Sequence, residues 1–109
     1  MAQEKDLIPV KNKVKDFCLL LKRKGIPVEK VLLFGSHAKG TQQPWSDIDF
    51  CVVSPQFGKN PSGEFRKLMR WAASVDSDLS PIPFHPSDLE DKYSTLVWEI
   101  KKTGQEIKL

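Results

Sequence analysis

Cysteines, long apolar runs and an excess of charge of one sign are all scarce in this chain of 109 residues. Its two cysteines, Cys18 and Cys51, are too few for a disulfide framework and lack the CxxC spacing of a metal site. We therefore expect reduced thiols that face the core of a cytoplasmic protein. The longest apolar run, residues 17–21, is too short to span a bilayer. The first residues, MAQEKDLIPVKNK, contain no apolar segment of a secretory signal. These absences predict a protein that neither crosses a membrane nor is secreted.

The charge balance is also ordinary, with 17 Lys and Arg against 14 Asp and Glu and a net charge of +3. This small surplus permits a phosphate or another polyanionic ligand without implying one. Nucleic-acid-binding modules usually carry more positive charge, and this chain has only one tyrosine to combine with its basic residues. A nucleic-acid partner is therefore the less favoured alternative. Hydrophobic residues make up 39% and charged residues 28%, values typical of a folded domain, and the length predicts one domain, residues 1–109.

The hydrophobic pattern alternates between helical and strand spacing along the chain. Apolar residues at helical spacing predict a first helix, with Pro9 in its first turn and Gly25 at its end. Short apolar segments then predict strands over 28–35 and 46–54. We expect the following further elements: a helix after Asn60, a third strand over 77–84, a short helical piece over 86–89, a last helix from Tyr93 to Gly104 and a small strand over 105–109. Pro81 and Pro83 would confine the third strand to a sheet edge or a short pairing. This order predicts an α/β or α+β domain of two layers.

The residues that can carry chemistry lie in the segment GSHAKGTQQPWSDID, residues 35–49. Asp47 and Asp49 are two positions apart on an expected strand, so their side chains project from one face, about 6.5–7 Å apart along the strand. Such carboxylates can bind Mg²⁺ together with water and substrate phosphate, and a pair of ions can hold the attacking and leaving oxygens of a phosphoryl displacement. An isolated Asp-x-Asp is more often a solvent-facing strand, and that alternative stays open from these residues alone.

Gly35 and Ser36 lie where the first strand gives way to an expected helical turn. A glycine there lets backbone N–H groups approach a phosphate, and the serine hydroxyl adds a donor. Lys39 adds a mobile positive charge. An isolated Gly-Ser pair after a strand is usually only a turn.

Together these features resemble a known signature. The segment LLFGSHAKGTQQPWSDIDFCVV resembles the pattern G-S-x-A-x-G-x(n)-S-D-x-D of the DNA polymerase β-like nucleotidyltransferase superfamily, in particular its minimal, single-domain members. The residues on the pattern are Gly35, Ser36, Ala38, Gly40, Ser46, Asp47 and Asp49. The resemblance implies a mixed sheet flanked by helices, the palm fold of that superfamily. It also implies Mg²⁺ bound by the aspartates and a nucleoside triphosphate, with ATP the expected donor, bound at the Gly-Ser turn with Lys39 and Ser46 nearby.

The resemblance further implies the reaction and its partner. A hydroxyl attacks the α-phosphate, the nucleoside monophosphate is transferred, and pyrophosphate leaves. Minimal members are often the antitoxin partners of small helical toxins of the HEPN class, on which they can deposit AMP. We therefore expect a partner protein as the acceptor, with Tyr93 and Trp98 of the last helix offering one surface for it. The alternative is a catalytically incomplete protein that keeps the fold and binds the nucleotide or the partner.

The sequence departs from the family pattern at one position. Active members usually carry a third carboxylate on the third strand, and the segment SPIPF places Ser80 there. Serine binds Mg²⁺ poorly and is a weak base near neutral pH. Asp78, two residues earlier, is our candidate for the third metal ligand and catalytic carboxylate, and Asp76 is a more remote one. An incomplete site is the alternative.

Other side chains give weaker indications. We expect His37, at a variable position of the motif, to be an exposed bystander. Trp45, beside the motif serine, would wedge the loop or stack on a base. Trp71 and Trp98 fall on expected helices and are interpreted as core or half-core residues.

Overall fold

A computed structural model of the chain describes residues 4–43 and 46–109, so Trp45 lies outside the described residues. The elements follow in the order α1 (Glu4–Arg23), β1 (Lys30–Phe34), α2 (Ser36–Lys39), β2 (Ile48–Val53), α3 (Pro61–Val75), β3 (Leu79–Phe84), the 3-10 helix η1 (Pro86–Glu90), α4 (Thr95–Thr103) and β4 (Gln105–Glu106). None of the described helices is both long enough and apolar enough to cross a membrane. The expected alternation of helices and strands is confirmed.

The strands form one mixed sheet in the order β3-β2-β1-β4. β1 runs antiparallel to both β2 and β4, whereas β2 and β3 run parallel. The parallel pair is joined through α3, as such a crossover requires. β3 lies at the sheet edge, as its prolines predict, because Pro81 and Pro83 have no N–H groups for a second neighbour.

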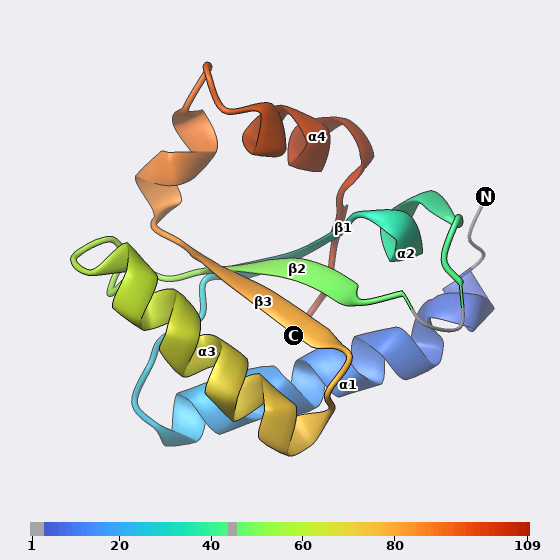
Figure 1. Cartoon of the computed structure of the whole chain (residues 1–109), viewed down its shortest axis with the longest axis horizontal. Helices are drawn as coiled ribbons and strands as arrows, with labels where there is room; N and C mark the ends of the chain where they lie inside the picture. Colours follow the sequence, from blue (N-terminus) through green and yellow to red (C-terminus); the bar gives the residue numbers. More distant parts are fainter. Residues whose placement is uncertain (1–3, 44–45) are drawn as a thin grey trace.

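The two faces of the sheet are covered unequally (Figure 1). Alternate side chains of β2 point to opposite faces. Phe50 and its neighbours pack with α1 and α3, where the rings of Phe17 and Phe50 meet edge to face with centroids 5.7 Å apart. On the other face Cys51 and Val53 pack with Val97 and Ile100 of α4. Asp49 shares this second face, so the face that α4 covers is also the face that carries the site.

The two cysteines are buried as the sequence predicts, whereas α1 and α4 both begin at residues other than those expected. Cys18 and Cys51 are free and buried, as expected. α1 begins at Glu4, so the prediction that Pro9 lies in its first turn is wrong: Pro9 lies inside the helix, which tolerates the missing N–H because its next turns pack into the core. α4 begins at Thr95, so the prediction that Tyr93 lies on it is wrong. Ser94 accepts a hydrogen bond from the Val97 N–H and caps the helix instead.

Candidate active site

The first strand ends against the second aspartate of the motif. Phe34 and Asp49 are register partners in the antiparallel pair of β1 and β2, and Gly35 follows directly. Gly35 has φ 76° and ψ −154°, a conformation that is almost restricted to glycine. A Cβ at this position would lie 2.6 Å from Oδ2 of Asp49. Glycine is therefore required by both backbone conformation and space, and it brings the main chain against the carboxylate.

The turn that follows is held in a fixed shape. The N–H groups of Ala38 and Lys39 donate to the Gly35 carbonyl, and Gly40, at φ 78°, ends α2. Ala38 is buried, which anchors the short helix to the core. The side-chain amide of Gln105, next to α4, donates to the Ala38 carbonyl at 3.0 Å. The first N–H groups of a helix have no acceptor within it, so this turn presents donors beside Asp49.

The two aspartates of the motif interact electrostatically. Burial raises the pKa of Asp49 above its ordinary value, and the negative charges of Asp47 and, less strongly, Glu99 act in the same direction. The charge of His37 and a hydrogen bond from Ser80 lower the pKa in part. Asp49 is half-buried and Asp47 is exposed, and their negative charges repel each other at the start of β2. A hard divalent cation bound between them would neutralise this charge. Asp47 and Asp49 therefore fit the predicted Mg²⁺ ligands chemically.

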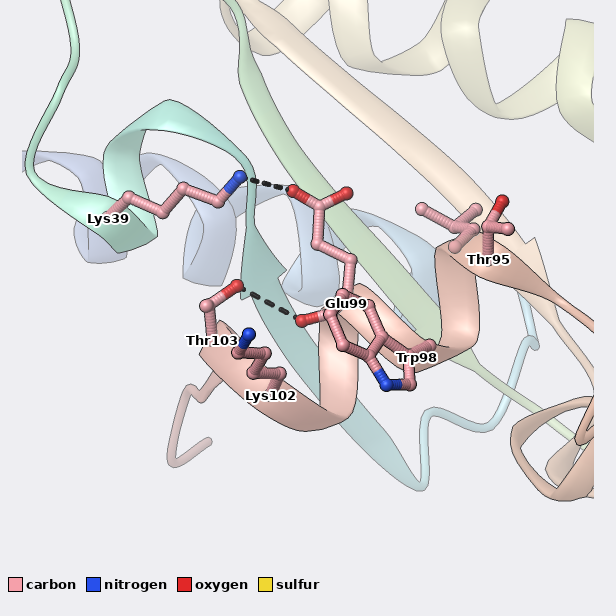
Figure 2. Close-up of a pocket in the computed structure, with 7 residues that line it drawn as sticks. Lys39, Thr95, Trp98, Glu99, Lys102 and Thr103 are labelled. Carbon is pink, nitrogen blue, oxygen red and sulfur yellow. Dashed lines mark hydrogen bonds and ion pairs between the residues drawn. The ribbon is translucent and has the colours of Figure 1, made fainter.

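Lys39 is bound by a residue that no motif in the sequence singles out. Its Nζ lies 2.6 Å from Oε1 of Glu99 on α4 (Figure 2). The two residues are sixty positions apart (99 − 39), so no local spacing connects them. Glu99 also acts on the pKa of Asp49, and it therefore belongs to the surroundings of the site. The charge of Lys39 is therefore balanced by Glu99, and the role of Lys39 as a phosphate ligand stays a prediction.

The loop before β2 is closed by Ser46. Its hydroxyl accepts a hydrogen bond from the Gln43 N–H at 2.8 Å, and its carbonyl accepts one from Nε2 of His37 at 3.4 Å. His37 is half-buried, so its expected exposure is wrong: its ring reaches across to the Ser46 carbonyl. Its Nδ1 and the Oε1 of Gln42 are buried without a hydrogen-bond partner among the described residues. Ser46 thus holds the loop that precedes the aspartates.

The third strand places a serine opposite Asp49. Asp49 and Ser80 are register partners in the parallel pair of β2 and β3. Asp78 lies before β3, with its carbonyl accepting from the Ile48 N–H and its N–H donating to Asp76 Oδ1. Asp76 is also ion-paired with Lys13 at 2.9 Å.

Asp78 lines a separate hollow together with His37 and Ser46. Within residues 4–43 and 46–109, no three His, Cys, Asp or Glu side chains lie close enough together to hold a metal ion. The position opposite Asp49 is therefore occupied by a hydroxyl, and Asp78 as third ligand stays a prediction.

The comparisons with known proteins agree with this geometry. The sequence pattern of the nucleotidyltransferase domain family matches residues 11–108. The chain belongs to this family. It is a nucleotidyltransferase by its domain, and the resemblance predicted from the Gly-Ser and Asp-x-Asp motifs is confirmed. No curated protein matches the sequence closely enough to count as a relative.

Solved structures give the same result for the fold. The nucleotidyltransferase is similar to the crystal structure of a toxin–antitoxin with AMP-PNP, at 27% identity and a TM-score of 0.63, over 90% of this chain and 72% of that one. It is similar to a mutant of the toxin–antitoxin MntA-HpeT at 25% identity and a TM-score of 0.61, with the same coverage of 90% and 72%. The toxin–antitoxin MntA-HepT shares the fold at 23% identity and a TM-score of 0.55, over 90% of this chain and 68% of that one.

Proposed function

We propose that this nucleotidyltransferase transfers AMP from ATP to a hydroxyl group of a partner protein, with Mg²⁺ bound by Asp47 and Asp49. The observation that carries the proposal is the contact between Gly35 and Asp49, which joins a turn suited to phosphate with a pair of carboxylates. Mg²⁺ bound there would neutralise charge on the phosphates and orient them for attack. The chain's own residues bind the triphosphate at the Gly35–Ser36 turn, and Lys39 adds a positive charge beside it.

The reaction itself is a displacement at phosphorus. The acceptor oxygen forms a bond to the α-phosphorus while the bond from that phosphorus to the pyrophosphate oxygen breaks. The hydroxyl proton passes to a base, and pyrophosphate leaves. Holding the two reacting oxygens in line accounts for much of the catalysis in such reactions.

The similar solved structures support the proposal of a partner protein. Two similar structures are toxin–antitoxin complexes, and one of them contains AMP-PNP, a triphosphate analogue. These support an antitoxin role for this chain beside a small helical partner of the HEPN class, whose hydroxyl would receive AMP.

Replacement of the aspartates tests the reaction. In a mixture of α-labelled ATP, Mg²⁺ and the co-expressed partner, we expect Asp47→Asn or Asp49→Asn to lower label transfer at least about a hundredfold, because each removes a negative charge that balances the cation. Asp16→Asn, which changes an exposed carboxylate on α1, is the matched control and should transfer label normally. Full transfer by either active-site variant at saturating Mg²⁺ would contradict the assignment.

A second candidate function rests on Ser80. Because a hydroxyl faces Asp49 where active relatives carry a carboxylate, the chain would bind ATP and its partner while transferring AMP slowly or not at all. ATP binding without label transfer by the wild-type chain would support this candidate.

A further inference from the structure

A groove lies between α2 and α4, and no step of the proposed reaction depends on it (Figure 2). Its volume of about 660 Å³ lies within the range of small-molecule sites. The side chains that line it include Lys39, Thr95, Trp98, Glu99, Lys102 and Thr103. We refer to it as the α2–α4 groove.

The groove is joined to the phosphate end of the site. Lys39 belongs to the short helix that begins at Ser36, and its ion pair with Glu99 forms the wall between α2 and α4. A nucleotide with its phosphates at the Gly35–Ser36 turn therefore has this groove directly beside it.

The lining has the chemistry of a ring-binding site. Trp98 is 63% exposed, although its sequence position had suggested a half-core residue, so that expectation is wrong. The Nζ of Lys102 lies 4.6 Å from the centre of the Trp98 ring. An exposed indole with the Lys102 ammonium over it fits a ligand that combines an aromatic ring with negative charge, while the other lysine of the groove, Lys39, is paired with Glu99. The hydroxyl of Thr95 adds a hydrogen-bonding group to this lining, whereas the hydroxyl of Thr103 donates to the Glu99 carbonyl at 3.0 Å.

The second hollow beside the site is chemically different. It is lined by His37, Ser46 and Asp78 among others, and none of the lining residues described there is aromatic apart from the imidazole of His37. We propose that the α2–α4 groove binds the nucleoside part of the donor nucleotide, with the base stacked on the Trp98 ring. This inference rests on the proposed function and adds to it the subsite that distinguishes a nucleotide from a bare triphosphate.

Calorimetric titration of the folded chain with ATP, and separately with inorganic tripolyphosphate, both in the presence of Mg²⁺, tests the subsite. We expect Trp98→Leu to weaken ATP binding about tenfold, the scale of one base stacked on an aromatic side chain, and to change tripolyphosphate binding less than about twofold. Trp71→Leu is the matched control. Trp71 lies on α3, on the opposite face of the sheet, and also carries a lysine over its ring. This control should leave both affinities unchanged.

Every other outcome of these titrations contradicts the proposed base-binding site, and each outcome points to a different alternative. If Trp98→Leu binds ATP like the wild type, or weakens ATP and tripolyphosphate equally, the base does not stack there. A selective loss of ATP binding in Trp45→Leu instead would place the base at the loop. An unchanged ATP affinity with loss of the partner complex in Trp98→Leu would make the groove a protein-docking surface. If the wild type binds neither ligand, the proposed function itself fails, and the subsite with it.

Discussion

At the scale of single residues, the site depends on how closely the backbone of Gly35 approaches Asp49. The motif predicted that Gly35 is needed for the geometry of a turn, and the structure supplies a second reason, the 2.6 Å that would separate an added Cβ from the Asp49 carboxylate oxygen. The motif could not reveal this contact, because it depends on the register between β1 and β2. The pairing of Lys39 with Glu99 is likewise a tertiary contact that no spacing in the sequence indicates.

Replacement of Gly35 separates these two effects. We expect Gly35→Ala to weaken ATP binding about tenfold or more and to lower the free energy of unfolding by about 1–3 kcal/mol, because alanine is strained at this φ and ψ. Its methyl group would also displace the Asp49 carboxylate. Calorimetry with ATP and thermal melting measure the two losses.

Gly25→Ala is the control for strain alone. Gly25 also has a positive φ, 82°, but a Cβ there meets nothing within 4 Å. This variant should lose stability and keep its ATP affinity. Equal ATP affinity in Gly35→Ala and the wild type would show that phosphate binds elsewhere.

The raised pKa of Asp49 predicts how the stability of the fold depends on pH. Because its pKa is raised in the folded chain, it binds its proton more tightly there than in the unfolded chain. Its contribution to stability is present below the ordinary pKa of 3.8 and is lost as the pH rises through the raised value. We therefore expect Asp49→Asn to melt at a higher temperature than the wild type in a chelator at neutral pH, with the difference disappearing below pH 3.8. Melting curves from pH 3 to pH 7, about the span of the titration, measure this.

Two comparisons make this experiment decisive. Asp16→Asn removes an exposed carboxylate of α1 and should melt like the wild type. Added Mg²⁺ should raise the melting temperature of the wild type more than that of Asp49→Asn, because only the wild type keeps both carboxylates. A wild type that is more stable than Asp49→Asn across the whole pH range without metal would show that burial does not disfavour the ionised carboxylate.

At the scale of elements, the proline pattern was the most informative feature of the sequence. Pro81 and Pro83 predicted an edge strand, and β3 is one, since backbone groups without N–H can serve only one neighbour. The start of α4 was harder to predict, because Tyr93 continues the apolar spacing of the helix while Ser94 provides the cap. Apolar spacing alone cannot separate such residues, and local hydrogen bonding decides the boundary.

β3 also decides whether the site is complete. Ser80→Glu would place a carboxylate opposite Asp49, and we expect the rate of AMP transfer at saturating Mg²⁺ to rise about tenfold or more, because charge placed beside the reacting phosphate has large effects. Ser80→Gln, of similar size and without charge, should bring no gain. Asp78→Ala in the same assay tests the other prediction. Abolished transfer would assign the third carboxylate to Asp78, and Ser80→Glu would then add nothing.

At the scale of the whole molecule, the arrangement of helices leaves the site accessible. α1 and α3 cover one face of the sheet, whereas α4 packs on the other face against Cys51 and Val53 (Figure 1). Asp49 lies at the opposite end of β2 from Val53, next to the turn that starts α2. The alternation of helices and strands predicted the α/β class correctly, but the expected two layers are wrong: helices pack on both faces of the sheet, which gives three layers. The opening at one end of the α4 face could not be predicted, because it depends on where α4 packs.

An open site of this kind calls for an acceptor that binds from outside. We expect a small helical protein encoded alongside to form a complex with this chain on co-expression, seen as co-migration in gel filtration. After incubation with ATP and Mg²⁺, mass spectrometry should show the mass of AMP added to that partner. Asp49→Asn is the control that separates the two steps: it should co-migrate with the partner and leave its mass unchanged, because the substitution removes a proposed metal ligand without altering the surface of α4. Failure of the wild-type chain both to co-migrate with the partner and to modify it would remove the partner from the proposal, while ATP binding would remain as a separate property of the site.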